Sequence, residues 1–263
     1  MLPLALDLEQ LTSGVAKVYW PLVRVSGVLA VAPVLGSPLV PVRIRVVIAV
    51  VLTMAMLPLT GPMPDVDPLS MSAVMITINQ LIIGLVIGFV LLIVFNVMNV
   101  AGESISASMG LGFALMADPT SNVQVPVLTQ FLTILATIIF LAIDGHHALI
   151  NMMATSFSVV PVSESISPDG FWQMVEWSAI LFRGAILIAL PALVTMLCVN
   201  VVMGVMTRSA PQLNIFSVGF PITMLAGFIV IMLTMPGFGP GFQRLLIDGF
   251  DTMLSILTGM VLP

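Results

Sequence analysis

The chain has 263 residues, of which 59% are hydrophobic and only 7% are charged. Soluble domains carry about 25% charged residues, so the composition excludes an ordinary soluble protein and indicates an integral membrane protein. Acidic residues outnumber basic ones by 12 to 7, giving a formal net charge of −5, which excludes the basic surface of a nucleic-acid-binding protein. The single cysteine, Cys198, excludes an internal disulfide.

Seven apolar stretches follow one another along the chain, and a more amphipathic segment comes last. Their approximate bounds are 15–35, 46–59, 71–100, 127–143, 148–160, 178–206 and 215–235, followed by 242–262. A membrane-spanning helix needs about 20 apolar residues, so some stretches are too short and others too long. These uneven lengths predict an all-α membrane protein with about six long helices, plus broken or re-entrant pieces, in which other protein surrounds many of the helices.

Prolines and glycines interrupt the apolar stretches. A proline removes a helix hydrogen bond and bends the helix, and such kinks persist where neighbouring helices satisfy the freed carbonyls. The prolines concerned are Pro21, Pro33, Pro191 and Pro221. We therefore expect kinked helices. Gly84-Leu-Val-Ile-Gly88 has a spacing that lets two helices approach closely, although this pattern is common in apolar sequences.

Basic residues in short loops predict the sides of the membrane. The loops 36–45 and 207–214 carry arginine and are predicted to be cytoplasmic, whereas the acidic loops 61–69 and 161–176 are predicted to be external. These assignments agree only if 127–143 crosses the membrane and 148–160 does not. A re-entrant hairpin or half-helix is therefore expected at 144–160.

A glycine-rich segment follows the third stretch, and it runs Gly102-Glu-Ser-Ile-Ser-Ala-Ser-Met-Gly-Leu-Gly-Phe-Ala-Leu-Met-Ala-Asp-Pro119. Its glycines argue against one continuous lipid-facing helix, yet it is too apolar for an ordinary loop. Non-helical backbone persists at membrane depth only where protein buries it or where it lines a cavity. The residue types allow two interpretations, namely a constriction that closes a pore by dewetting and a buried loop that only packs between helices.

Two carboxylates, Glu103 and Asp118, lie near the ends of this segment. Intramembrane carboxylates are costly and usually functional, so a small-solute or ion transporter with a broken-helix site is an alternative function. Asp118 directly precedes Pro119 and is suited to cap a following helix, which is the role that we favour. For Glu103, a functional or inter-subunit role stays open, because Gly102 would let a partner approach it.

Two adjacent histidines, His146 and His147, follow Asp144-Gly145 and raise the possibility of a metal site. Adjacent histidines do not share a helix face, so we favour a polar turn that caps the preceding helix. No Ser/His/Asp set, phosphate loop or dinucleotide fingerprint is present. We predict no enzymatic activity and no catalytic, cofactor-binding or metal-binding residue.

The last segment, 240–263, is predicted to be an amphipathic helix. Its apolar stripe consists of Phe242, Leu245, Leu246, Gly249, Met253 and Leu257, and its polar stripe of Gln243, Asp248, Asp251 and Ser255. This pattern suits a helix that lies in an interface or covers another subunit.

A set of motifs also runs in order along nearly the whole chain. The motifs are Gly102-Glu103, Gly110-Leu111-Gly112-Phe113-Ala114, Asp118-Pro119, Asp144-Gly145-His146-His147, Ala189-Leu190-Pro191, and the string from Arg208 through Ala210-Pro211-Gln212-Leu213-Asn214-Ile215-Phe216 to Gly219-Phe220-Pro221. Together they resemble the FliR/SctT family of type III secretion export-gate proteins. They are closer to its flagellar branch than to its injectisome branch.

The resemblance implies a hetero-oligomeric cone of kinked helical hairpins, formed with FliP-like and FliQ-like subunits. FlhB-like and FlhA-like proteins, the basal-body ring and membrane lipid are the implied neighbours. In this family the cone passes unfolded flagellar proteins across the bacterial inner membrane at the flagellar basal body. The implied role is therefore that of an export-gate subunit needed for flagellum assembly.

The resemblance also implies roles for particular residues. The whole chain, 1–263, is expected to be one export-gate domain, with the pore-plug loop region at 102–126. The implied plug residues are Met109, Gly110, Leu111, Gly112, Phe113 and Met116. The implied structural or inter-subunit residues are Glu103, Asp118, Pro119, Arg208, Pro211, Gln212, Phe216 and Pro221. As a hypothesis, the two methionines and Phe113 occlude the lumen, and the glycines let the loop move aside.

Overall fold

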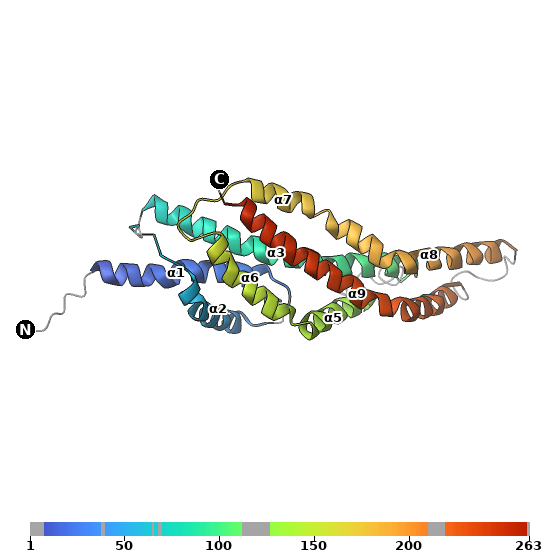
Figure 1. The fold of residues 1–263 in the computed structure, drawn as a ribbon. Helices are drawn as coiled ribbons and strands as arrows, with labels where there is room; N and C mark the ends of the chain where they lie inside the picture. Colours follow the sequence, from blue (N-terminus) through green and yellow to red (C-terminus); the bar gives the residue numbers. More distant parts are fainter. Residues whose placement is uncertain are drawn as a thin grey trace, which may run out of the picture. The chain divides into compact units, whose positions relative to one another are not determined.

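The structure is a computed structural model that describes residues 8–37, 40–64, 66–67, 70–111, 127–209 and 219–261. Helices make up most of these residues (Figure 1). They are α1 (Leu8–Val31), α2 (Val42–Met56), the 3-10 helix η1 (Leu57–Leu59), α3 (Met71–Ser108), α5 (Val127–Ala142), α6 (Gly145–Val159), α7 (Asp169–Trp177), α8 (Ile180–Ser209) and α9 (Phe220–Gly259). Within this part of the chain β structure is confined to one isolated bridge between Ile166 and Val261. The all-α prediction is confirmed.

The chain forms two compact units, each assembled from segments that are far apart in the sequence. The first unit comprises Met1–Ile93, Asp144–Ser178 and Ile247–Pro263, and the second comprises Val94–Ile143 and Ala179–Leu246. The first unit therefore contains α1, α2, α6 and α7, and the second contains α5 and α8. The helices α3 and α9 each contribute one part to each unit.

Among the described residues, four helical stretches are long and apolar enough to cross a membrane, namely Val42–Leu59, Met71–Ser108, Asp169–Ser209 and Phe220–Gly259. The pair α5 and α6 would supply a fifth span, and the chain bends by 68° between them. This bent pair falls where a broken or re-entrant helix was predicted. The long and short lengths in this set match the uneven apolar stretches of the sequence.

The second apolar stretch is longer than predicted. Pro41 is the N-cap of α2, so the helix begins at Val42 and includes Arg43 and Arg45, which were assigned to a loop. The guanidinium of Arg45 reaches back to the preceding turn, where its Nη2 donates to the carbonyl oxygens of Ser37 and Val40 at 3.0 and 3.3 Å. Together with η1 the stretch reaches 18 residues, which is enough for a short span.

Glycines bring α1 and the first part of α3 into close contact within the first unit. A Cβ built on Gly84 would lie 2.1 Å from the carbonyl oxygen of Arg24, and one built on Gly88 would lie 2.9 Å from that of Val28. On α1, Gly27 lies directly against the same helix, because its Cβ would be 3.2 Å from the Cα of Gly84. The close approach predicted from the Gly84–Gly88 spacing is confirmed.

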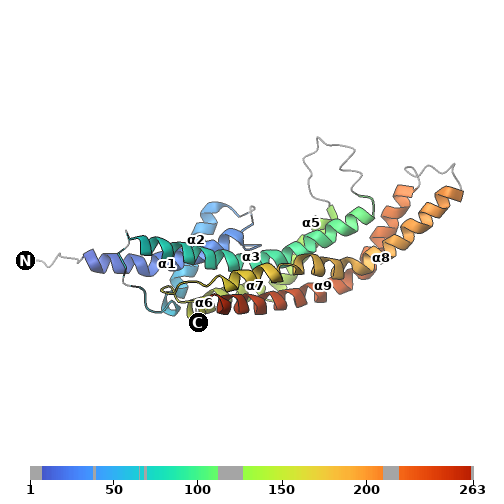
Figure 2. The ribbon, with the colours of Figure 1, turned by 90° about the horizontal axis from the view of Figure 1, so that it is seen from above.

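Aromatic side chains form the core of the second unit. Phe95 of α3 packs edge-on against Phe140 of α5 and Phe242 of α9, with ring centroids 5.5 and 5.3 Å apart. Helix α8 runs beside α9 in this unit (Figure 2), and a Cβ built on Gly241 would lie 3.5 Å from Ile188. Edge-to-face pairs of buried phenylalanines are a stabilising arrangement.

Helix α9 is continuous where a separate C-terminal helix was expected. It runs from Phe220 to Gly259 and includes Pro236 and Pro240. The predicted amphipathic pattern is nevertheless present within it. Phe242, Leu246, Gly249, Met253 and Leu257 are buried, and Gln243, Asp248, Asp251 and Ser255 are exposed. In the described chain this apolar stripe packs against the protein's own residues.

Candidate functional site

The predicted plug begins at the C-terminal end of α3. This helix continues through Gly102 to Ser108, so the first part of the glycine-rich segment is helical. The hydroxyls of Ser104 and Ser108 donate to the carbonyl oxygens four residues earlier, at 2.8 and 2.9 Å, and add no break in the helix. The helix therefore extends beyond the apolar stretch that ended at residue 100.

Gly110 ends the helix. The N–H of Leu111 donates to the carbonyl of Ser106 at 3.1 Å, and the N–H of Gly110 donates to that of Ala107 at 3.1 Å. This pair of bonds is a Schellman motif, which requires the left-handed conformation at the residue just after the helix. Gly110 has φ of +77°. In the described structure the glycine is thus a defined helix stop, whereas its proposed role in loop movement stays a prediction.

Met109 lies inside the second unit and is completely buried. Its side chain lies against Gly227 of α9. A Cβ built on that glycine would come within 2.5 Å of Cγ and Cε of Met109 and within 2.8 Å of its Sδ. The methionine therefore occupies the space next to α9 that only a glycine leaves free.

A side chain of α8 also contacts the end of α3. The Nδ2 of Asn200 donates to the carbonyl oxygen of Ser108 at 3.0 Å. This carbonyl is among the last four of the helix, which have no partner inside it. The end of α3 is thus bound by α8 on one side and packed against α9 through Met109.

The structure describes only some of the other predicted residues in the glycine-rich segment. Glu103 is exposed, and Leu111 is half-buried. Gly102 faces α5 of the same chain, since its Cβ would lie 2.8 Å from the Cα of Thr129. The approach that Gly102 permits is therefore used by the protein itself. The other predicted plug and anchor residues, Gly112, Phe113, Met116, Asp118 and Pro119, lie outside the described residues.

Of the predicted structural residues between 208 and 221, the structure describes some and not others. Arg208 is exposed in the last turn of α8, where a positive charge interacts favourably with the helix dipole. Pro221 is the second residue of α9, a position that needs no N–H donor. Pro211, Gln212 and Phe216 lie outside the described residues. Their inter-subunit roles stay predictions.

Arg24 forms a buried polar site in the first unit. It is a charged residue within an apolar stretch of the sequence, and it is only 1% exposed. Its Nε donates to Oε1 of Gln80 at 2.8 Å, and its two terminal nitrogens donate to the carbonyl oxygens of Ser156 and Val160 at 2.7 and 2.8 Å. The guanidinium also lies 4.3 Å from the ring centre of Phe157. These partners lie on α3 and at the end of α6, and no local sequence signal connects them with α1.

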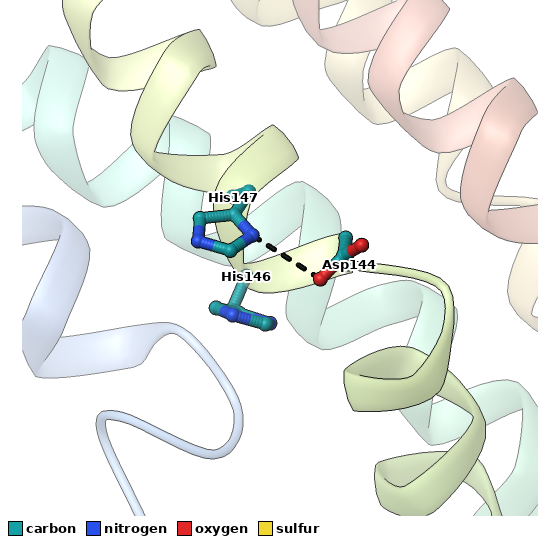
Figure 3. Close-up of side chains that lie close together, drawn as sticks. All are labelled: Asp144, His146 and His147. Carbon is teal, nitrogen blue, oxygen red and sulfur yellow. Dashed lines mark hydrogen bonds and ion pairs between the residues drawn. The ribbon is translucent and has the colours of Figure 1, made fainter.

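Asp144, His146 and His147 lie together where α6 begins (Figure 3). Nδ1 of His147 is 3.2 Å from Oδ1 of Asp144, and the two histidine rings are 4.1 Å apart. Although adjacent residues do not share a helix face, the two rings lie close together and are tilted by 37°. Asp144 adopts the left-handed conformation of a turn and begins the following helix instead of capping the preceding one.

One potential ligand atom from each of these three residues lies within 4.8 Å of the others, so the group has the spacing that a metal ion would need. The side chains of His147 and Asp144 are 71% and 73% exposed, and they already bond to one another. Exposure and an internal hydrogen bond are ordinary for a polar turn. The absence of a metal site stays a prediction.

Long apolar helices, a bent helix pair and glycine-mediated helix contacts define a polytopic α-helical membrane protein. The family model described as bacterial export proteins, family 1, matches residues 15–248, and the chain belongs to this family. The resemblance drawn from the sequence motifs is confirmed.

Relatives cover nearly the whole chain. The flagellar biosynthetic protein FliR of Escherichia coli (strain K12) is 32% identical over 255 residues, which is 97% of both chains. The protein of the same name from Pectobacterium carotovorum subsp. carotovorum is 33% identical over 249 residues, or 94% of this chain and 95% of the relative. That of Aquifex aeolicus (strain VF5) is 32% identical over 217 residues, or 81% and 83%.

Proposed function

We propose that the chain is a subunit of the flagellar export gate in the bacterial inner membrane. It forms part of the pore through which unfolded flagellar proteins leave the cytoplasm, and it contributes the plug that closes this pore at rest. Membership of the export family and similarity to flagellar biosynthetic proteins along nearly the full length support this proposal. The protein acts as a structural part of the gate and not as an enzyme.

The burial of Met109 is the observation that carries the plug proposal. This residue is the first of the predicted plug, and other helices of its own unit cover it completely. A plug must be held in place at its base so that the apolar residues beyond it stay across the lumen. Met109 holds the base, Phe113 and Met116 occlude the pore, and a narrow apolar constriction excludes water and ions.

Exposed apolar side chains support assembly with other subunits. On α8 they recur along the helix, at Phe182, Ile186, Leu190, Val194, Leu197 and Val201. Large apolar faces of this kind are normally covered by protein or lipid. FliP-like and FliQ-like subunits would cover them in a hetero-oligomeric cone, with FlhB-like and FlhA-like proteins and the basal-body ring as further neighbours.

The plug proposal is tested by deleting residues 109–116 or replacing their apolar side chains with serine. Two quantities are measured in cells, the entry of ions or small dyes through the membrane and the assembly of flagella. We expect leakage while the complex still assembles. An assembled complex with no leakage and normal export would refute the plug.

The transporter alternative depends on the carboxylates Glu103 and Asp118. Glu103 is exposed, and Asp118 lies outside the described residues. Replacing Glu103 with glutamine tests this alternative directly. Under the export-gate proposal the substitution leaves both membrane integrity and solute uptake unchanged.

A further inference from the structure

The contact between Met109 and Gly227 joins the base of the predicted plug to a helix far along the chain. Both residues are buried in the second unit. A Cβ at Gly227 would overlap the Cγ, Sδ and Cε atoms of the methionine, at 2.5, 2.8 and 2.5 Å. Real Cβ atoms do not approach other heavy atoms so closely. The glycine is therefore a specific seat for this side chain.

Glycines of the same unit differ in what surrounds them: a Cβ built on Gly102 would lie 2.8 Å from Thr129, and one built on Gly184 would lie 3.2 Å from Val97. Gly237 lies on the same helix as Gly227, and a Cβ built there would meet no atom within 4 Å. The same is true of Gly204 on α8. A glycine inside a helix costs about 0.5–1 kcal/mol relative to alanine. At Gly227 the missing side chain makes room for Met109, which gives the glycine a packing function.

We propose that Gly227 is a positioning residue of the gate, and that the seating of Met109 against it holds the base of the plug in the closed position. This inference rests on the export-gate function proposed above. The Schellman motif at Gly110 fixes the direction in which the chain leaves α3, and the bond from Asn200 holds the carbonyl of Ser108. Seating Met109 completes the attachment of this base to α8 and α9.

The chemistry of methionine suits a contact that must be broken and remade. Its unbranched thioether has three rotatable bonds and adapts to irregular spaces. It can leave the surface of Gly227 by rotating, without any change in the backbone of α9. The seated and released positions of Met109 would then correspond to the held and freed base of the plug.

The test compares Gly227→Ala with Gly237→Ala in the complete export complex. The first substitution places a methyl group where Met109 packs, and the second adds the same methyl group to the same helix in open space. We expect ion or dye entry to rise by about tenfold with Gly227→Ala, which corresponds to about 1.4 kcal/mol, and to stay at the wild-type level with Gly237→Ala. Co-purification of the partner subunits shows whether each complex assembles.

A double variant shows whether the two residues act through one contact. Met109→Ala removes the seated side chain and should raise leakage by a similar factor. Because the smaller side chain leaves room for a methyl group on α9, Met109→Ala combined with Gly227→Ala should assemble and leak no more than Met109→Ala alone. If the Gly227→Ala complex does not assemble, the Met109→Ala complex tests the proposal instead. Wild-type levels of ion or dye entry in the Met109→Ala complex would then overturn the proposed role of Gly227.

Failure of this inference is distinguishable from failure of the proposed function. If deletion of 109–116 causes leakage but Gly227→Ala, in an assembled complex, does not, the plug stands and the seat is wrong. Equal leakage from Gly227→Ala and Gly237→Ala also overturns the seat, because the effect then belongs to α9 in general. If the deletion itself causes no leakage, the proposed plug is wrong and the seat falls with it.

Discussion

Arg24 of α1 donates a hydrogen bond to Gln80 of α3 across a 2.8 Å distance, in the interior of the first unit. The same guanidinium satisfies two carbonyl oxygens at the end of α6, those of Ser156 and Val160. The carbonyl of Ser156 also accepts the N–H of Val160 at 2.9 Å, whereas Val160 is the C-cap residue of α6. One arginine thus joins α1 and α3 while it supplies the donors that end α6.

Replacing Arg24 with leucine should destabilise the first unit. The substitution removes the donor to Gln80 and the donor to the carbonyl of Val160, while the carbonyl of Ser156 keeps the N–H of Val160. Each unsatisfied buried group costs about 1–3 kcal/mol. We expect a loss of about 3 kcal/mol or more, measured by thermal unfolding in detergent. Arg183→Leu is the control, because Arg183 is exposed. Equal melting temperatures for the two variants would contradict the structural role of Arg24.

Gly84→Ala should separate α1 from α3. The added Cβ would lie 2.1 Å from a backbone oxygen of α1, which cannot move aside as a flexible side chain can. Forcing extra volume into a packed site costs about 1–3 kcal/mol. Gly204→Ala, which meets nothing within 4 Å, should be neutral or slightly stabilising. Protease resistance of the purified protein would rank the two variants, and the reverse order would disprove the close contact.

Gly110→Ala should weaken the end of α3 through the backbone alone. A residue with a Cβ pays about 1–2 kcal/mol in the left-handed conformation, whereas asparagine tolerates it better. Gly110→Asn should therefore lose less stability than Gly110→Ala in the same thermal assay. Gly61 also has a positive φ, of +67°, and no neighbour within 4 Å, so Gly61→Ala measures the backbone cost away from the plug. Leakage with Gly110→Ala but not Gly61→Ala would tie the helix stop to closure.

Phe242→Ala should disrupt the core of the second unit. Its ring is fully buried and packs edge-on against Phe95, and truncation of a buried phenylalanine costs about 3–5 kcal/mol. Phe228→Ala is the matched control on the same helix, because Phe228 is 53% exposed. We expect a large fall in melting temperature for the first variant and a small one for the second. Similar falls would show that the cluster does not form the core.

The sequence predicted the helical class, the bent pair and the close glycine contact, because apolar length and small-residue spacing are local properties. Helix ends were less predictable. The glycines of 102–112 indicated a break from residue 102, yet only Gly110 ends the helix, since Gly102 is used for packing against Thr129. The segment 240–263 was likewise predicted to be a separate amphipathic helix, but it belongs to α9, which continues through Pro236 and Pro240.

Contacts between distant segments could not be predicted from the sequence. Arg24 is visible in the sequence as a charge in an apolar stretch, but its partners are uncharged and lie on other helices. Nothing near Gly227 connects it with Met109 either. Such pairs depend on how the helices pack, which a single sequence does not contain.

Because Met109 packs against Gly227, substitutions at these two positions should depend on one another in evolution, although the positions lie far apart in the chain. A side chain is gained at the second position without displacing the methionine only when the first has become smaller, so the order of substitutions matters. Relatives with alanine or serine in place of the glycine should carry a residue shorter than methionine opposite it. Moving either residue alone into such a relative should then reproduce the leak, and moving both together should avoid it.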